Sequence, residues 1–176
     1  MIHTQRVPGI DRGVHSLPWK VERFIMRILG VRAAPKEASF VVFCTEKQEL
    51  VCVDIIKIPL ILETPEKLKF IRNNILDILR EYSVAKACIR ITESNSQNLN
   101  IDRLYIEGVI QEALSSSNVS SYANSRQKTI CSKLGITSKE FKSIIAGEMA
   151  FKNIDTSEYD ANTNEAILAS LSMEDF

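Results

Sequence analysis

The sequence predicts a single α/β domain in which a three-stranded antiparallel meander is extended by parallel strands and covered by helices on both faces. Three apolar segments follow one another through short connections over residues 24–58. A helical segment then separates them from a fourth apolar segment, as in a right-handed crossover between parallel strands. Further helical patterns follow to the end of the chain, whose 176 residues suffice for one domain with a substantial core.

Composition narrows the class of protein. Hydrophobic residues make up 45% of the chain and charged residues 25%, which is ordinary for a soluble globular protein. Basic and acidic residues both number 22, so the total charge does not mark a strongly basic nucleic-acid binder, although a local basic surface can exist. No apolar run approaches the roughly 18 residues of a membrane span, and no signal-peptide pattern opens the chain. We expect a cytoplasmic protein without membrane contact.

The cysteines do not indicate a metal site. The four are widely spaced and include no Cys-x-x-Cys pair: Cys44, Cys52, Cys88 and Cys131. We expect reduced thiols that pack as small hydrophobic side chains. The only histidines, His3 and His15, lie near the N-terminus, which makes a zinc site of cysteine and histidine improbable.

Residues 1–20 predict an N-terminal arm, followed by the domain over residues 21–176. The arm holds two of the five prolines, both histidines and the only tryptophan, without periodicity. Such arms are often ordered only by a partner. In one arrangement Trp19 packs onto the body of the domain.

Three strands open the domain. They are rich in Val, Ile and Phe and are expected over residues 24–31, 38–44 and 50–58. The first is expected to break at Arg32 into a turn of small and charged residues. The polar tip at residues 46–49 suits a hairpin turn, so the three strands form an antiparallel meander.

A helix and a fourth strand follow. Thr64, Pro65 and Glu66 supply a capping hydroxyl, a first-turn proline and an acid near the positive helix end. Apolar residues then recur at helical spacing: Leu68, Ile71, Ile75, Leu76 and Leu79. The helix is expected to end near Tyr82, and residues 85–91 predict the fourth strand.

The remainder of the chain is expected to be mostly helical. Residues 92–100 form a polar loop at a strand's carboxyl end, where open α/β sheets place binding sites. Its residues 94–100 can bond sugars, bases or a partner's backbone, or merely cap the next helix. That helix shows apolar residues at Ile101, Leu104, Tyr105, Val109 and Ala113. A short strand at 119–123, two helices within 126–147 around Gly135, and a terminal helix at 162–171 complete the expectation.

This order of elements resembles the ribonuclease H-like fold, and within it the RuvC-type Holliday-junction resolvases. The resemblance extends loosely from Arg27 to Leu171. Four segments carry it: residues 28–32, 88–93, 127–135 and 160–166.

The resemblance implies a metal-dependent nuclease with acidic residues ending the first and fourth strands and further acids on the last helix. Such chemistry uses two divalent cations roughly 4 Å apart, held by oxygen ligands. Here Arg32 stands at the first acidic position, and a guanidinium cannot ligate a cation. At the fourth strand the register places either Arg90 or Glu93 at the acidic position. Asp160 and Glu165 are available on the last helix, or are simply acids on a solvated helix end.

Two roles for Arg32 follow from this departure. It can pair with Glu93 or Glu165 and so replace a metal ion structurally. Alternatively it can contact phosphate, with or without Arg90, because a guanidinium binds phosphate bidentately.

A basic cluster lies in the predicted pair of helices around Gly135. Within seventeen residues there are five basic side chains and one acid, Glu140; the bases are Arg126, Lys128, Lys133, Lys139 and Lys142. A basic surface suits a polyanionic partner. The segment also matches a helix-turn-helix, in which the second helix would enter the major groove. Two short helices joined through glycine have the same pattern without that function.

The sequence therefore predicts a non-catalytic protein that binds nucleic acid or scaffolds a nucleic-acid-processing complex, with no cofactor. The residues expected to contact nucleic acid are Arg32, Arg90, Arg126, Lys128 and Lys133. One alternative is an endonuclease dependent on Mg²⁺ or Mn²⁺, whose ligands would be Glu93, Asp160 and Glu165. Another is a module that binds a partner protein, including a second copy of itself. The apolar N-terminal arm favours this alternative.

Overall fold

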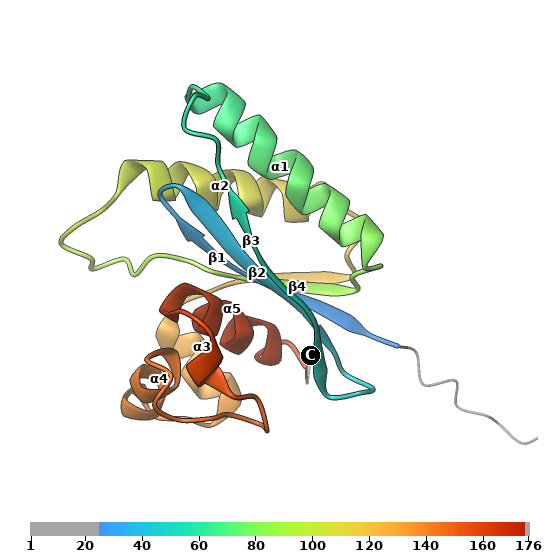
Figure 1. The fold of residues 1–176 in the computed structure, drawn as a ribbon, viewed down its shortest axis with the longest axis vertical. Helices are drawn as coiled ribbons and strands as arrows, with labels where there is room; N and C mark the ends of the chain where they lie inside the picture. Colours follow the sequence, from blue (N-terminus) through green and yellow to red (C-terminus); the bar gives the residue numbers. More distant parts are fainter. Residues whose placement is uncertain (1–24, 175–176) are drawn as a thin grey trace, which may run out of the picture.

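A computed structural model of the chain describes residues 25–174 as a five-stranded mixed sheet between two layers of helices (Figure 1). The strands are β1 (Arg27–Ala34), β2 (Glu37–Cys44), β3 (Glu49–Lys57), β4 (Lys86–Arg90) and β5 (Ser121–Ser125). Their order in the sheet is β3-β2-β1-β4-β5. Neighbours are antiparallel from β3 to β1 and parallel from β1 to β5, which confirms the predicted meander with parallel extension. The predicted arm, residues 1–20, lies outside the described residues.

Helices cover both faces of the sheet. They are α1 (Thr64–Glu81), α2 (Ile101–Ser115), α3 (Gln127–Leu134), α4 (Ser138–Ile145) and α5 (Ala161–Leu171), with a 3-10 turn at Thr156–Glu158. Helices α1 and α2 lie on one face, and α3, α4 and α5 lie on the other (Figure 1). Within residues 25–174, no helix has the length and apolar character needed to cross a membrane.

Each face of the sheet has its own hydrophobic core, and β1 contributes to both by alternation. Leu29 and Val31 belong to the core under α1 and α2. Ile28 belongs to the core under α5, which also contains Cys88. As expected, the cysteines are free thiols, and Cys44, Cys88 and Cys131 are buried while Cys52 is half-buried. Burial raises the pKa of the Cys88 thiol.

The first strand ends three residues later than predicted, at Ala34 instead of residue 31. It continues through Arg32 to Ala34, because Ala33 and Ala34 are buried and pair with the start of β2. The turn therefore falls at residues 35–36, and Arg32 lies inside a central strand. The fifth strand was also misplaced, since it covers Ser121–Ser125 and not 119–123.

The apolar face of α2 was predicted correctly only for Val109, which packs against the core, and for the buried Ala113. Ile101, Leu104 and Tyr105 were expected to be buried, but all three are exposed. The buried face is instead formed by Ile106, Glu107, Ile110, Ala113 and Leu114. These residues pack on the sheet together with β1 and β4 side chains, which turns the first apolar residues of the helix outward.

Gly30 allows α5 to lie close against the sheet. A Cβ atom at this position would lie 2.0 Å from the carbonyl oxygen of Ala166 and 2.8 Å from the backbone nitrogen of Ser170. No side chain fits that space, so glycine is required by the contact with α5. The same face of β1 presents Arg32 two residues later.

We therefore expect Gly30→Ala to lower the free energy of unfolding by about 1–3 kcal/mol or more, because the added methyl group must push α5 from the sheet. Urea unfolding followed by circular dichroism measures the change. Gly108→Ala is the matched control, since a Cβ there has no neighbour within 4 Å. Because Gly108 is at an exposed position of α2, this variant should stabilise the fold by about 0.5–1 kcal/mol. Equal effects of the two variants would contradict the packing argument.

Candidate functional site: a buried arginine–glutamate network

Two arginines lie side by side in the centre of the sheet. Arg32 of β1 and Arg90 of β4 are partners in the parallel register. Both are almost fully buried, with 7% and 4% of their surface exposed. Nη1 of Arg32 donates a hydrogen bond of 2.9 Å to the backbone carbonyl of Arg90, and a guanidinium of Arg90 donates to the carbonyl of Ile91. The two positive charges are therefore held together away from solvent.

Glu165 of α5 balances both arginines. Its Oε2 atom lies 2.8 Å from Nε of Arg32 and 3.3 Å from Nε of Arg90. Neither Nε–H group is directed at that oxygen as in a regular hydrogen bond, so the contacts are ion pairs. The sequence offered Glu93 or Glu165 as the partner of Arg32, and the structure pairs it with Glu165, whereas Glu93 pairs with Arg90.

Glu107 of α2 reaches the network from the opposite face of the sheet. Its Oε1 atom lies 3.3 Å from Nη1 of Arg32. Both carboxylate oxygens accept the backbone N–H of Thr92 at 3.0 Å, and Oε1 also accepts the Thr92 hydroxyl at 2.7 Å. Glu107 therefore joins the end of β4 to β1.

Sequence reasoning missed Glu107. Its spacing contains the signal that was needed, because Glu107 precedes the buried Ile110 by three residues and the buried Leu114 by seven. That spacing places a charged side chain on the buried face of a helix, where it requires a partner.

Glu93 completes the network beyond the end of β4. Its Oε1 atom lies 2.9 Å from Nη2 of Arg90 and accepts the backbone N–H of Gln127 at 3.0 Å. Strand β4 ends at Arg90, so the chain turns and Glu93 folds back toward the arginine. The register is thereby decided: Arg90, and not Glu93, occupies the strand position beside Arg32. The contact with Gln127 places a carboxylate at the positive end of α3.

The network is largely neutralised by its own members, which are two guanidiniums and three carboxylates: Arg32, Arg90, Glu93, Glu107 and Glu165. Burial lowers the pKa of Arg32, and the charge of Glu165 opposes that shift. A guanidinium is not deprotonated in proteins, so Arg32 keeps its positive charge. The arrangement suits structural pairing, since its charged groups are already occupied by one another.

No protein-family model matches the chain, and no curated protein matches it. Among solved structures, RuvC of Thermus thermophilus aligns with a TM-score of 0.62 and 13% identity, over 84% of this chain and 92% of that one. The same protein in complex with a Holliday junction substrate gives 0.63 and 15%, over 84% and 91%. The yeast mitochondrial Holliday junction resolvase Ydc2 gives 0.54 and 12%, over 85% and 78%.

The fold of this chain is RuvC-like. This confirms the fold expected from the order of elements. The resemblance also implies divalent cations, and the arginine–glutamate network lies where their ligands were expected. The residues present do not fit such ions. Arg32 and Arg90 place two positive charges against Glu165, and a cation there would be repelled.

The three alternative metal ligands, Glu93, Asp160 and Glu165, are not gathered at one site. Glu93 and Glu165 both pair with Arg90. Asp160 instead caps α5 by accepting the backbone N–H of Thr163 at 2.7 Å, and it lines a shallow groove beside Val53 of β3. Within residues 25–174, no group of three or more His, Cys, Asp or Glu residues is arranged to hold a metal ion.

The predicted basic cluster lies on α3 and α4. Four of its members are exposed and form no ion pair with another residue of the range 25–174: Arg126, Lys128, Lys139 and Lys142. Lys133 differs, because it is half-buried and its Nζ atom lies 3.8 Å from Sδ of Met173. We call the four exposed residues the α3–α4 basic surface.

This surface adjoins the network through the start of α3. Arg126 and Lys128 flank Gln127, whose N–H binds Glu93. Helix α3 ends at Leu134 and is followed by its C-cap Gly135, which has a left-handed φ of 67°. Thr137 caps α4, so the two predicted helices around Gly135 are confirmed.

We expect Arg32→Met to lower the free energy of unfolding by about 3–5 kcal/mol, because it leaves Glu107 and Glu165 buried with fewer partners. Denaturant unfolding measures the loss. Arg72→Met is the matched control, because Arg72 pairs with Glu112 in an exposed ion pair at 2.6 Å. That variant should leave stability nearly unchanged. If both variants unfold at the same denaturant concentration, the network does not stabilise the fold.

Proposed function

We propose that this chain is a non-catalytic RuvC-like protein that binds nucleic acid, either alone or within a nucleic-acid-processing complex. The observation that carries the proposal is the position of Arg32 and Arg90, side by side and ion-paired with Glu165. Two-metal hydrolysis needs carboxylates free to hold cations that activate water and stabilise the leaving oxygen. Here those carboxylates are engaged by arginine.

The α3–α4 basic surface is the part that we assign to nucleic acid. Its exposed cations are free of ion pairs within the described residues, and phosphate contacts come mainly from such side chains. Arg126 and Lys128 are its members beside the network. Arg32 and Arg90 were expected to contact phosphate as well, but both guanidiniums are buried and already paired. We assign them the structural role.

A DNA-binding measurement tests this assignment. The chain should bind branched or single-stranded DNA with a salt-dependent affinity that persists in chelator. Arg126→Ala combined with Lys128→Ala should weaken binding and reduce the slope of log affinity against log salt by about 2, because each cation contributes about one unit. Fluorescence anisotropy at several salt concentrations measures both quantities.

A control pair of the same residue types lies on the opposite face of the sheet. Lys69→Ala with Arg80→Ala removes one lysine and one arginine from α1 and should leave binding unchanged. If both double variants lose the same DNA affinity, the loss comes from the change in net charge and not from the position of Arg126 and Lys128. Unchanged binding in the Arg126 and Lys128 double variant would remove the basic surface from the proposal.

The proposal also predicts indifference to divalent cations. Ligands that bind the folded state raise the melting temperature, so Mg²⁺, Mn²⁺ and chelator should all give the same value. The chain should not cleave branched DNA with either ion. Cleavage that requires Mg²⁺ or Mn²⁺ and disappears in Glu93→Gln would instead establish the alternative, a nuclease with rearranged ligands.

A second candidate, a module that binds a partner protein or another copy of the chain, is favoured by one observation. Four large apolar side chains are exposed around the start of α2: Leu99, Ile101, Leu104 and Tyr105. Neighbouring exposed apolar residues are typical of protein contact sites. The DNA-binding measurement separates the candidates, because a chain that binds no nucleic acid at any salt concentration supports this one.

A further inference from the structure

The outer edge of β3 is open in the part of the chain that the structure describes. Strand β3 ends the sheet, and among residues 25–174 no strand pairs with its outer side. The N–H of Ile58, directly after β3, donates to the carbonyl of Lys36 at 3.0 Å, on the side of β2. Backbone groups alternate between the two sides of a strand, so those of Val53 and Ile55 face outward. Such an edge can accept a further strand.

The side chain of Asp54 confirms the direction of one of these groups. Its Oδ1 atom accepts the N–H of Ile55 at 2.7 Å, so this donor is not used by β2. Charged side chains commonly cover the edges of sheets in this way. A strand added to β3 replaces the carboxylate with its own carbonyl oxygen, and Asp54 is then free to pair with a positive charge.

A shallow groove of about 290 Å³ lies beside this edge, between β3 and the segment that leads into α5. Its apolar lining comes from Val53, Ile55 and Tyr159. Val53 and Tyr159 also pack at the border of the core under α5, so the groove has an apolar floor. The groove therefore lies on the α5 face of the sheet, where every second side chain of an added strand would enter it.

The charge of the groove indicates the kind of partner. Its lining includes the carboxylates of Asp54, Glu158 and Asp160 and no basic side chain. Glu158 is exposed and forms no ion pair with another residue of the range 25–174. These carboxylates attract a basic segment and repel the phosphates of a nucleic acid. The partner of this edge is therefore a polypeptide.

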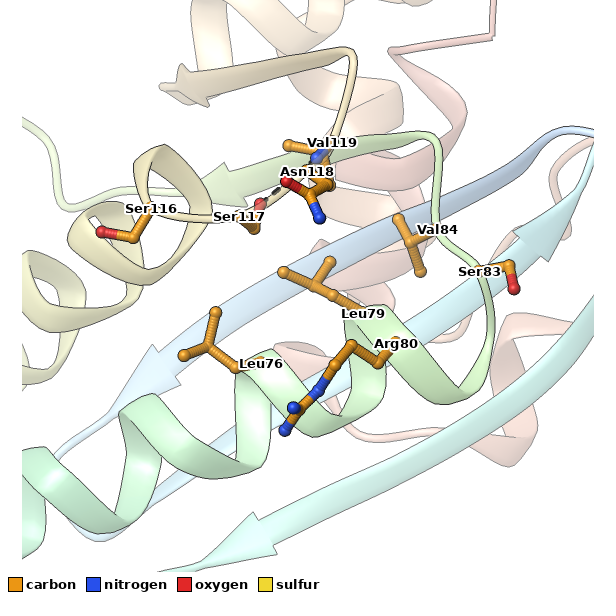
Figure 2. A pocket seen from close by; sticks show the side chains of 9 residues that line it. All are labelled: Leu76, Leu79, Arg80, Ser83, Val84, Ser116, Ser117, Asn118 and Val119. Atoms are coloured by element: carbon orange, nitrogen blue, oxygen red, sulfur yellow. Dashed lines mark hydrogen bonds between the residues drawn. The ribbon is translucent and has the colours of Figure 1, made fainter.

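A separate cavity of about 460 Å³, between the last turns of α1 and α2, has a different character (Figure 2). Its lining contains Arg80 together with apolar, hydroxyl and amide side chains, and it contains no carboxylate. A basic segment therefore finds matching charge at the groove beside β3 and not in this cavity.

We propose that the edge of β3 and its groove bind an extended segment of a partner protein in which basic and apolar side chains alternate. The backbone of the segment pairs with Val53 and Ile55. Its basic side chains lie on the α5 face, where their aliphatic stems cover Tyr159 and their charged ends meet the carboxylates of the groove. This inference does not depend on the proposed nucleic-acid function, and it concerns a surface other than the start of α2.

Peptide binding tests the charge of the partner. The probe is a fluorescein-labelled peptide of alternating lysine and valine with nine residues, the length of β3. Fluorescence anisotropy should show binding to the full chain that weakens with salt, and no binding of a peptide of alternating glutamate and valine. Asp54→Asn with Glu158→Gln should weaken binding several-fold. Asp77→Asn with Glu81→Gln removes the same two residue types from α1 and should leave the affinity unchanged. Equal losses in both double variants would overturn the proposal.

A change in the backbone tests strand addition. Val53→Pro removes an outward N–H, which an edge strand tolerates, and should weaken peptide binding several-fold. Val53→Thr keeps the N–H and should bind the peptide nearly as well as the unmodified chain. Equal losses in these two variants would overturn the proposal.

Modified probes keep the test decisive if Val53→Pro does not fold. Two peptides carry methyl groups on alternate backbone nitrogens, in complementary sets. One set should abolish binding and the other should retain it, because only one side of the added strand faces β3. Equal binding of both probes would overturn the proposal. A dimer of the unmodified chain that dissociates in Val53→Pro would also overturn it, because a second copy would then occupy the edge.

Discussion

The ion pairs that Glu165 makes with Arg32 and Arg90 hold α5 against the two central strands, β1 and β4. Two buried guanidiniums in adjacent strands repel each other, and removing each from water costs several kcal/mol. A carboxylate that contacts both arginines offsets the repulsion and the loss of hydration, and among the three carboxylates of the network this is Glu165 of α5. The close approach that delivers Glu165 depends in turn on Gly30, where a side chain would collide with the α5 backbone. Gly30 therefore lets α5 approach the sheet, and Arg32, two residues later, pairs with the carboxylate that α5 brings.

The network places positive charge among carboxylates that meet at one end of the RuvC-like sheet. Carboxylates that converge at the end of a sheet repel each other unless a positive charge lies between them. In a two-metal nuclease the cations supply that charge. In this chain the charge is carried by two side chains of the sheet itself, and three acids from α2, α5 and the loop after β4 surround them. Electrostatic balance is thus maintained by permanent groups.

Much of this fold follows from local sequence patterns. The strand and helix order and the parallel crossover come from alternation and helix caps, and the resemblance left Glu93 and Glu165 as the two possible partners of Arg32. What failed depends on tertiary packing. The end of β1 was set too early because Arg32 suggested a turn, whereas burial of Ala33 and Ala34 extends the strand. Glu107 was missed because α2 begins with apolar residues that its packing leaves in solvent.

Glu165 lies on α5, which follows β1 and β4 in the chain, and this order has a consequence for folding. During synthesis, β1 and β4 emerge well before α5, and domains generally fold as units once their segments are available. A nascent chain that ends before α5 holds Arg32 and Arg90 in adjacent strands without the carboxylate that they share. Glu107 and Glu93 are made earlier and each pair with one of the two arginines, so the charge between β1 and β4 is balanced only in part until α5 follows. Helix α5 therefore completes the charge balance between these two strands.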